Sequence, residues 1–503
     1  MSRSPHPAIS GAPAGSFLGG SPLREQAAVG APAIVGLGLG LWGITGPSAW
    51  TDEIVTMDVA HRSGPRLIEL LGHVDVVHGL HYVLVYLLGQ AAGVNELTVR
   101  LPSAMAVAVA AGGLGWLGRL LGGRRLGLYA GLLLAVMPTA SRYAQEARSF
   151  PFVMAVAVLA TGALVKTLSG SGNARWPAGY AVLIALLGWF NVMGLLLVAA
   201  HAVTVALRRP GRRRAVRLLM AQAVGITAAV PLLLLGFRQR SAVGEAAPVT
   251  AGTPFSYLTW LLTPGQDTLP SVLKLLLALT ALAAVALLVA RRHQAPPLLL
   301  AVGGPWLAVP PLLLLAVSLG RPLFAYRYLL FCMPALALLL AAAATVLLPR
   351  ERLLFALLLA APIAVSHLAI RQQDSRPWDT TAILTTLRSH AAPEDGVLFS
   401  GGRCELIASA YPEVFAHLPD LGTAKTAAER GTLDNLPADP ALLHRRLAHA
   451  PRVWHITCRH LSAGACQAAT RSAAAQQQAL AGAGLAPAHH RSARGLEITL
   501  YQR

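Results

Sequence analysis

Long apolar runs, separated by short polar segments, make up most of this chain. Each run is about 15 to 22 residues long, which is the length at which a helix crosses the hydrocarbon core of a bilayer. The pattern therefore predicts an all-α polytopic membrane protein with about eleven transmembrane helices. The expected spans are 28–46, 98–118, 126–140, 151–168, 178–191, 193–207, 215–236, 270–290, 297–318, 328–348 and 352–370.

Two segments depart from this simple pattern. "GLHYVLVYLLGQAAG" at 79–93 is apolar but short, so we interpret it as an amphipathic helix on the outer interface, with Tyr82 and Tyr86 at headgroup level. Residues 178–207 are too long for one span, and "GWFNVMG" within them predicts a turn between two short spans.

The pattern changes after residue 370. "GVLFS", "RVWHITC" and "LEITLYQ" are typical of short strands, and "TTAILTTLRSH" and "TRSAAAQQQALAGAG" are typical of helices. We expect a small α/β domain over 371–503. Residues 1–27 are rich in Pro, Gly and Ser, so we expect a disordered N-terminal segment followed by a membrane domain over 28–370, with a first outer loop at 47–97.

The charge distribution orients this threading. Only 13% of the residues are charged, and the net charge is +19. Most Lys and Arg lie in short clusters between alternate apolar runs, as in the cytoplasmic loops of membrane proteins. The sequence has no basic stretch with interleaved aromatic residues, so nothing in it points to nucleic-acid binding. We therefore expect a multi-pass protein of the cell membrane, with the N-terminus in the cytoplasm and the C-terminal domain outside. The clusters lie within 119–125, 166–175, 208–214, 291–292 and 350–352.

Three of the four cysteines, Cys404, Cys458 and Cys466, lie in the expected outer domain, where the compartment allows a disulfide. Three pairings are open, and we select Cys458–Cys466. No cysteine spacing typical of a metal site is present, and we predict no metal ligands.

Ionisable residues near the membrane gather on the expected outer side. Such groups are costly at membrane depth and persist where they pair or line a wet cavity, so we expect several loops to meet in one polar cavity that opens outward. Asp52 and Glu53 begin the first outer loop. The other members are His73, Asp75, His78 and His81 in the same loop, Arg142, Glu146 and Arg148 in the second, and Arg321 and Arg327 in a later one.

Each piece has a simpler interpretation. Asp75, His78 and His81 recur at every third position, so they share one side of a helix, and that side could bind a substrate or a divalent cation. The simpler interpretation is that they are solvated side chains at the membrane interface. Whether a divalent cation binds here stays open. Arg142 and Glu146 are four residues apart and can form a local ion pair, for which Arg148 is not needed.

Acids and arginines on one face suit the transfer of a group from a lipid phosphate. A carboxylate, here Asp52, would deprotonate an acceptor hydroxyl. Arg142, Arg148 or Arg327 would hold the phosphate, because the guanidinium fork binds phosphate through two parallel hydrogen bonds. The polyprenyl tail of such a donor stays in the bilayer.

The chain resembles the bacterial glycosyltransferase family 39 proteins, which belong to the GT-C superfamily of polyprenyl-phosphate-sugar-dependent glycosyltransferases and in actinobacteria are mannosyltransferases. The resemblance lies in "WTDEIVTMDVAHRS", "HVDVVHGLHY", "LTVRLPSAMA", "RYAQEARSF" and "AYRYLLFCMPALALLLA", in this order over about residues 48 to 335, with "AYPEVF" and "RVWHIT" in the tail.

The resemblance implies that Asp52 is the base and that Glu53 holds the base or the acceptor. It places the lipid-linked sugar phosphate against the second outer loop, with Tyr143 beside its charged residues, and against Arg327 and Tyr328. His81 departs from the aromatic residue, such as Tyr, that the resemblance leads us to expect. Members of the superfamily differ in metal dependence, so His73, Asp75 and His78 stay candidates for substrate contacts.

The sequence therefore predicts an inverting glycosyltransferase that moves a hexose, by resemblance mannose, from a polyprenyl-phosphate donor to an acceptor hydroxyl on the outer face. The acceptor is a protein, a glycan or a lipid. A lipid or polysaccharide transporter is the main alternative, and a sensor or assembly protein is a second. Transporters carry polar residues on broken helices at the bilayer midplane, whereas these spans are mostly Ala, Leu, Val and Gly.

Overall fold

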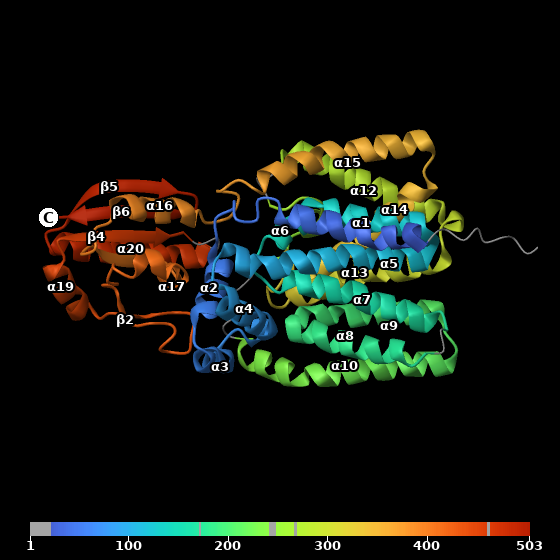
Figure 1. Cartoon of the computed structure of the whole chain (residues 1–503), viewed down its shortest axis with the longest axis horizontal. Coiled ribbons are helices and arrows are strands. Elements are labelled where there is room, and N and C mark those ends of the chain that lie inside the picture. The colour runs from blue at the N-terminus through green and yellow to red at the C-terminus, as the bar shows by residue number, and fades with distance from the viewer. Residues whose placement is uncertain (1–21, 171–172, 241–247, 266–268, 460–462) are drawn as a thin grey trace, which may run out of the picture.

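The computed structural model describes residues 22–170, 173–240, 248–265, 269–459 and 463–503. A bundle of long helices forms one part of the molecule, and a smaller domain with a β-sheet lies at one end of the bundle (Figure 1). Short helices α2 Thr51–His61, α3 Gly64–His73 and α4 Gly79–Ala92 lie between the two parts. This arrangement matches the predicted polytopic helical fold with a C-terminal α/β domain.

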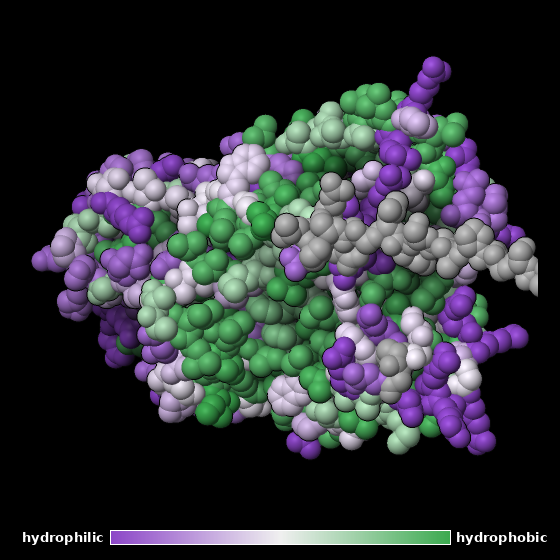
Figure 2. Space-filling model, turned by 45° about the vertical axis from the view of Figure 1, so that its right-hand side comes forward, coloured by the Kyte–Doolittle hydropathy of each residue, from purple (hydrophilic) through white to green (hydrophobic). Residues whose placement is uncertain are grey.

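Most of the bundle helices follow the predicted spans, but the helix Thr253–Leu262 was not predicted. Seven of the described helices are long and apolar enough to cross a membrane, and three further apolar helices are shorter. Their lipid-facing surface is visible as a hydrophobic band between two hydrophilic ends (Figure 2). The helices are α1 Pro22–Leu41, α5 Glu96–Val136, α6 Pro138–Ala144, α7 Phe150–Leu168, α8 Arg175–Phe190, α9 Leu196–Arg208, α10 Arg212–Arg238, α11 Thr253–Leu262, α12 Ser271–Ala290, α13 Pro297–Ser318, α14 Met333–Val346 and α15 Pro349–Ala369.

Two of these helices differ in detail from the prediction. The first helix begins at Pro22, so residues 22–27, which we expected to be disordered, are helical. Helix α5 covers two predicted spans, and non-helical backbone at Gly122 and Gly123 divides it into two arms. The arms pack against each other at Gly118 and Gly127, where an added Cβ on Gly118 would lie 2.8 Å from the other Cα. Small residues permit this close packing of backbones.

The break predicted within 178–207 lies at Asn191. Its extended backbone ends α8, and its side chain accepts a hydrogen bond from the backbone N–H of Met193. A short 3₁₀ segment, η2 Val192–Leu195, then leads into α9. The two short helices are therefore joined by irregular backbone at one end of the bundle.

The first loop folds into α2 Thr51–His61, α3 Gly64–His73, η1 Val76–His78 and α4 Gly79–Ala92. The structure confirms a helix over the segment 79–93. The expected position of Tyr82 was wrong, because its side chain is completely buried inside the protein rather than placed at headgroup level. The Tyr82 hydroxyl is hydrogen-bonded to Asp75 and Arg148.

The C-terminal domain contains a four-stranded sheet in the order β1-β4-β6-β5. Strand β1 runs parallel to β4, and the other neighbours are antiparallel. The three predicted strands are β1 Gly396–Ser400, β4 Arg452–Cys458 and β6 Leu496–Gln502, and the predicted helices are α16 Thr380–His390 and α20 Ala463–Gly482. The prediction missed the edge strand β5 Ala486–Ala493, whose side chains are nearly all exposed. The remaining elements are α17 Leu406–Ala410, α18 Pro412–Phe415, β2 Thr423–Lys425, β3 Leu436–Pro437 and α19 Pro440–His449.

The disulfide differs from the predicted one. Cys458 pairs with Cys404, not with Cys466. Cys458 ends β4, and Cys404 follows the parallel neighbour β1, so the sheet brings the two together although 54 positions separate them. Proximity along the chain favoured Cys466, but strand pairing decided the outcome.

The C-terminal domain packs directly on the first loop. Buried residues of α2, including Ile54 and Met57, share one hydrophobic core with Phe415 and Ile456 of the domain. Hydrogen bonds join the same parts: Tyr411 donates to the carboxylate of Glu96 at 2.7 Å. Helix α2 is therefore held between the bundle and the domain.

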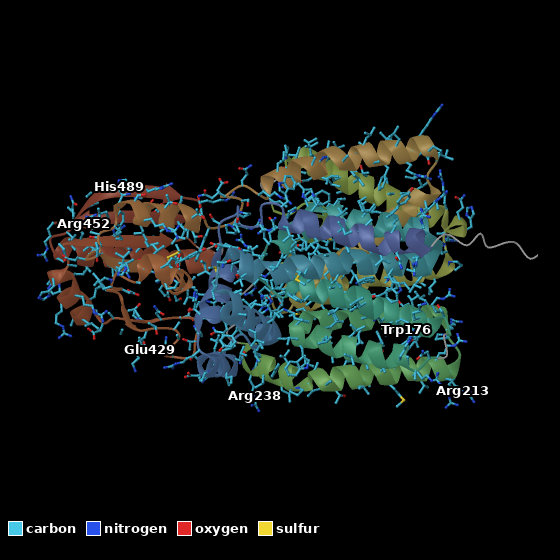
Figure 3. The ribbon with its side chains drawn as sticks, in the orientation of Figure 1. Trp176, Arg213, Arg238, Glu429, Arg452 and His489 are labelled. Carbon is cyan, nitrogen blue, oxygen red and sulfur yellow. A yellow bond between two sulfur atoms is a disulfide. The ribbon has the colours of Figure 1, made fainter. Side chains whose placement is uncertain are left out.

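The basic clusters lie together at the other end of the bundle. Arg213 and Trp176 lie far from the domain residues Glu429 and Arg452 (Figure 3). Arg214 donates to the carbonyl of Leu168 at 3.1 Å, so the end of α7 and the start of α10 share this end.

Candidate functional site

Asp52 stands in the first turn of α2, where the bundle meets the C-terminal domain. Its Oδ2 lies 3.7 Å from Nε of Arg148, and 18% of its side chain is exposed. Burial by itself would raise the pKa of the Asp52 carboxyl, but the guanidinium groups of Arg148 and Arg327 outweigh it and hold that pKa below its ordinary value. Asp52 is therefore an ionised carboxylate flanked by two cations.

Arg148 is held by residues of the first loop. Its Nη2 lies 3.0 Å from Nε2 of His78, and its Nη1 donates to the hydroxyl of Tyr82 at 3.4 Å. Tyr82 in turn donates to the carboxylate of Asp75 at 2.5 Å. The structure thus brings Asp75 and His78 beside Arg148.

Arg327 approaches Asp52 from another element, η5 Tyr326–Cys332. Within the described residues its side chain forms no hydrogen bond; its Nε is buried without a partner, and its guanidinium lies 5.7 Å from the ring of Tyr328. Arg327 and Tyr328 line a narrow crevice between α7, η2 and η5, together with Phe150 and Asn191. Arg327 is therefore available for an anionic ligand.

Aromatic rings surround this crevice. Phe150 lies between Tyr143 and Tyr328, with ring centroids 6.3 and 6.1 Å away. Tyr143 also meets the ring of Trp260 from α11 at 5.6 Å. The crevice leaves no room for a water molecule between its lining side chains. A bulky ligand therefore requires these rings to move apart.

Glu53 occupies a different environment from Asp52. Both of its oxygens accept hydrogen bonds from Arg100, at 2.7 and 2.9 Å, and one also accepts the backbone N–H of Ala147. Arg100 also donates to the carbonyls of Ile44 and Pro47, and both charged side chains are almost completely buried. Glu53 thus joins α2 to α5 and to the loop that carries Arg148, and its carboxylate does not face the Asp52 cluster.

Arg142 and Glu146 form the predicted local pair, with 3.6 Å between Nε and Oε2. Glu146 is completely buried, and burial raises the pKa of its carboxyl. The charges of Arg142 and of Arg376, which follows α15, act on the same carboxyl. This pair lies beside the Asp52 cluster, and its cation is already engaged.

Three other predicted residues make their contacts outside the Asp52–Arg148 pair. His73 is exposed, and its Nδ1 lies 3.2 Å from the carbonyl of Gly431 in the C-terminal domain. Arg321 is exposed and donates to the carbonyl of Arg240. His81 is buried against Phe152. No group of three or more His, Cys, Asp or Glu among the described residues could hold a metal ion.

Sequence reasoning missed Tyr82, Arg100 and Asn191. Tyr82 and Arg100 lie inside the quoted motifs "HVDVVHGLHY" and "LTVRLPSAMA", so the motifs contained the signal. Asn191 lies in the predicted break "GWFNVMG", where a polar residue at membrane depth is itself a sign of function.

Comparison with solved structures identifies the fold. The chain is similar to ArnT from Cupriavidus metallidurans in the apo state, with a TM-score of 0.61, 13% identity, and coverage of 93% of this chain and 97% of that chain. The same protein bound to undecaprenyl phosphate gives a TM-score of 0.55 at 14% identity, with the same coverage. No protein-family model matches the sequence, and no curated protein sequence matches it. The likeness establishes the polytopic GT-C fold.

Proposed function

We propose that this protein is a membrane glycosyltransferase that transfers a sugar from a polyprenyl-phosphate donor to an acceptor hydroxyl. The observation that carries the proposal is the carboxylate of Asp52, 3.7 Å from Nε of Arg148 and acted on by the charge of Arg327, at one end of a membrane bundle. The GT-C fold, and the binding of undecaprenyl phosphate by ArnT, support a lipid-phosphate donor for this site.

In the proposed reaction Asp52 accepts the proton of the acceptor hydroxyl. The hydroxyl oxygen forms a bond to C1 of the sugar, the bond between C1 and the phosphate oxygen breaks, and polyprenyl phosphate leaves with the bonding electron pair. Attack from the side opposite the leaving group inverts the configuration at C1. A general base placed in this way contributes about 10²- to 10⁴-fold to the rate.

Arg327 is the side chain we assign to the leaving phosphate. Arg142 faces Glu146, and Arg148 is engaged by His78 and Tyr82, so both have protein partners. Arg327 lies beside Asp52 and at the crevice, where its guanidinium can offer two parallel N–H donors to a phosphate. Its charge stabilises the phosphate as the negative charge on that group grows.

The site faces the outside of the cell in this proposal. The basic clusters at the opposite end favour the cytoplasm for that end, and a disulfide in the C-terminal domain favours an oxidising compartment. The oxidation state of this disulfide in intact cells tests the orientation. A hexose, and among hexoses mannose, rests on the resemblance of the sequence motifs.

The transporter alternative draws on one buried polar cluster within the bundle. Both ring nitrogens of His201 are hydrogen-bonded, one to the hydroxyl of Thr161 and the other to the hydroxyl of Tyr180. The Tyr180 hydroxyl also accepts a hydrogen bond from the side-chain amide of Gln222. Polar groups inside a membrane bundle suggest a transport path. Here the contacts are mutual and join α7, α8, α9 and α10, so we assign the cluster to helix packing.

Mass analysis of products tests the proposal. Membranes with and without the protein receive labelled polyprenyl-phosphate hexose, and the released polyprenyl phosphate and the glycosylated acceptor are measured. We expect Asp52→Asn to lower transfer about 10²- to 10⁴-fold. The matched control is Glu69→Gln, because Glu69 is an acid of the same loop whose side chain is 40% exposed. Full transfer by a folded Asp52→Asn protein would refute the role of Asp52.

A further inference from the structure

We propose that His78 and Tyr82 are positioning residues that hold the Arg148 guanidinium, so that its Nε alone faces Asp52. The inference rests on the proposed function, because it assigns residues to the same site. It differs from the interpretation of Asp75 and His78 as substrate or cation ligands: the structure assigns them to the support of an arginine.

The contact between Arg148 and His78 determines the state of the imidazole. A guanidinium only donates hydrogen bonds, so Nε2 of His78 must accept the bond from Nη2 at 3.0 Å. The proton of a neutral ring then lies on Nδ1, which donates to Oγ of Ser149 at 2.8 Å. Burial, and then the charge of Arg148, lower the pKa of His78 well below its ordinary value, which agrees with a neutral ring.

Asp75 orients the hydroxyl of Tyr82 for its hydrogen bond with Arg148. Because the hydroxyl of Tyr82 donates its proton to the carboxylate of Asp75, its lone pairs remain to accept from Nη1 of Arg148. Asp75 has a left-handed backbone, with φ 61°, which Asp tolerates better than most residues. This conformation begins η1, so the same turn carries both Asp75 and His78.

The remaining nitrogen of Arg148 faces Asp52. Nε of Arg148 and Oδ2 of Asp52 are buried, 3.7 Å apart, and neither has a hydrogen-bond partner. Since the first loop occupies Nη1 and Nη2, rotation of the guanidinium away from Asp52 would break two hydrogen bonds. The two supports therefore keep Nε of Arg148 directed toward Oδ2 of Asp52.

Four segments meet in this arrangement: α2 carries Asp52, η1 carries His78, α4 carries Tyr82, and the loop before α7 carries Arg148. The ring of His78 is fixed further by an edge contact with Phe150, with ring centroids 5.8 Å apart. Phe150 also lines the crevice beside Arg327. Phe150 thus contacts both the His78 ring and the crevice that holds Arg327.

The kinetic test compares His78→Ala, His78→Gln and Arg327→Ala. We expect His78→Ala to lower kcat about 10²-fold, because a displacement of a reacting group by 1 Å has this order of effect, with the KM for the donor nearly unchanged. The amide oxygen of Gln can accept from Arg148, so His78→Gln should recover most of the rate. Arg327→Ala should instead raise the KM for the donor. Equal effects of His78→Ala and Arg327→Ala on KM would overturn the inference, because His78 would then contact the donor.

The pH profile adds a result that a purely structural role would not produce. Arg148 keeps Asp52 ionised, so a loosened Arg148 should move the acidic limb of kcat/KM to higher pH in His78→Ala and in Tyr82→Phe. An unmoved limb in both variants would overturn the inference. The titratable and charged groups that face Asp52 are Arg148, Arg327, His78, Asp75, Tyr82, Tyr143 and Glu146.

A measurement without turnover separates this inference from the proposed function. In protein with ¹⁵N-labelled histidine, the His78 ring signals, identified by their absence in His78→Gln, should show a neutral ring protonated at Nδ1. Arg148→Met should abolish this tautomer preference. A charged ring, or a proton on Nε2, would overturn the inference even if transfer is confirmed. Failure of transfer with the expected ring state would refute the proposed function alone.

Discussion

Two adjacent acids in α2 have different surroundings. Successive residues of a helix point about 100° apart, because one turn contains 3.6 residues. Asp52 therefore faces Arg148 and Arg327, whereas Glu53 turns toward Arg100 between α2 and α5. One acid is partly exposed and suited to take a proton, and the other is buried and joins two helices. Position along the helix assigns the two roles.

The Glu53–Arg100 pair makes a prediction about stability. Glu53→Gln should lower the free energy of unfolding by about 3–5 kcal/mol, because it leaves the buried charge of Arg100 without its carboxylate. The double variant Glu53→Met/Arg100→Met should recover much of this loss, since apolar pairs often replace a buried ion pair without cost. Thermal unfolding in detergent measures both. An unchanged midpoint for Glu53→Gln would contradict the assignment.

At the scale of elements, irregular backbone determines where the polar residues meet. Asn191 ends α8 beside the crevice, and the short segment η5 carries Arg327 to the same place. The turn at Gly122 and Gly123 folds α5 back on itself at the other end of the bundle. Breaks between helices thus place Asn191 and Arg327 at the end of the bundle that carries Asp52. At the opposite, basic end, the break in α5 makes a short connection between its two arms.

The contribution of the α5 turn to stability can be tested by adding one methyl group at Gly123. Gly123 has φ +84°, a backbone conformation that strains any residue with a Cβ. We expect Gly123→Ala to destabilise the protein by about 1–3 kcal/mol. The control is Gly38→Ala in α1, where an added Cβ meets nothing within 4 Å and a helical Ala is favoured by about 1 kcal/mol. Chemical unfolding compares the two, and equal effects would contradict the role of Gly123.

At the scale of the whole molecule, the C-terminal domain completes the site. It covers the buried side of α2, and Ser409 donates to the carboxylate of Asp58 while Arg62 donates to the carbonyl of Thr432. Asp52 therefore lies on a helix fixed from two sides. The domain acts on the site through the position of α2.

The disulfide tests both this assembly and its orientation. Alkylation of intact cells followed by peptide mapping should find Cys404 joined to Cys458, as expected for an oxidising compartment. Cys404→Ser/Cys458→Ser should lower stability by about 2–4 kcal/mol. Cys332→Ser is the control, since Cys332 is a buried free thiol. Reduced cysteines in the mapped peptides would contradict the outward orientation, and a bridge to Cys466 would contradict the sheet register.

The sequence by itself determined most helices of the bundle (though not α11), the strands β1, β4 and β6, and the grouping of polar residues at one end. Each of these follows from hydrophobic periodicity or from the local placement of charge, which depend on neighbours along the chain. The exposed polar strand β5 lacks such periodicity, and so it was missed.

Only the tertiary structure decided which charged groups meet. Asp52, Arg148 and Arg327 come from distant loops, and the choice of Arg100 for Glu53, of Cys404 for Cys458 and of His78 for Arg148 depends on packing between elements. The physical reason is range: a local pattern specifies which face of an element is polar, whereas a hydrogen bond or disulfide requires two such faces within a few ångströms, and this depends on how all elements pack.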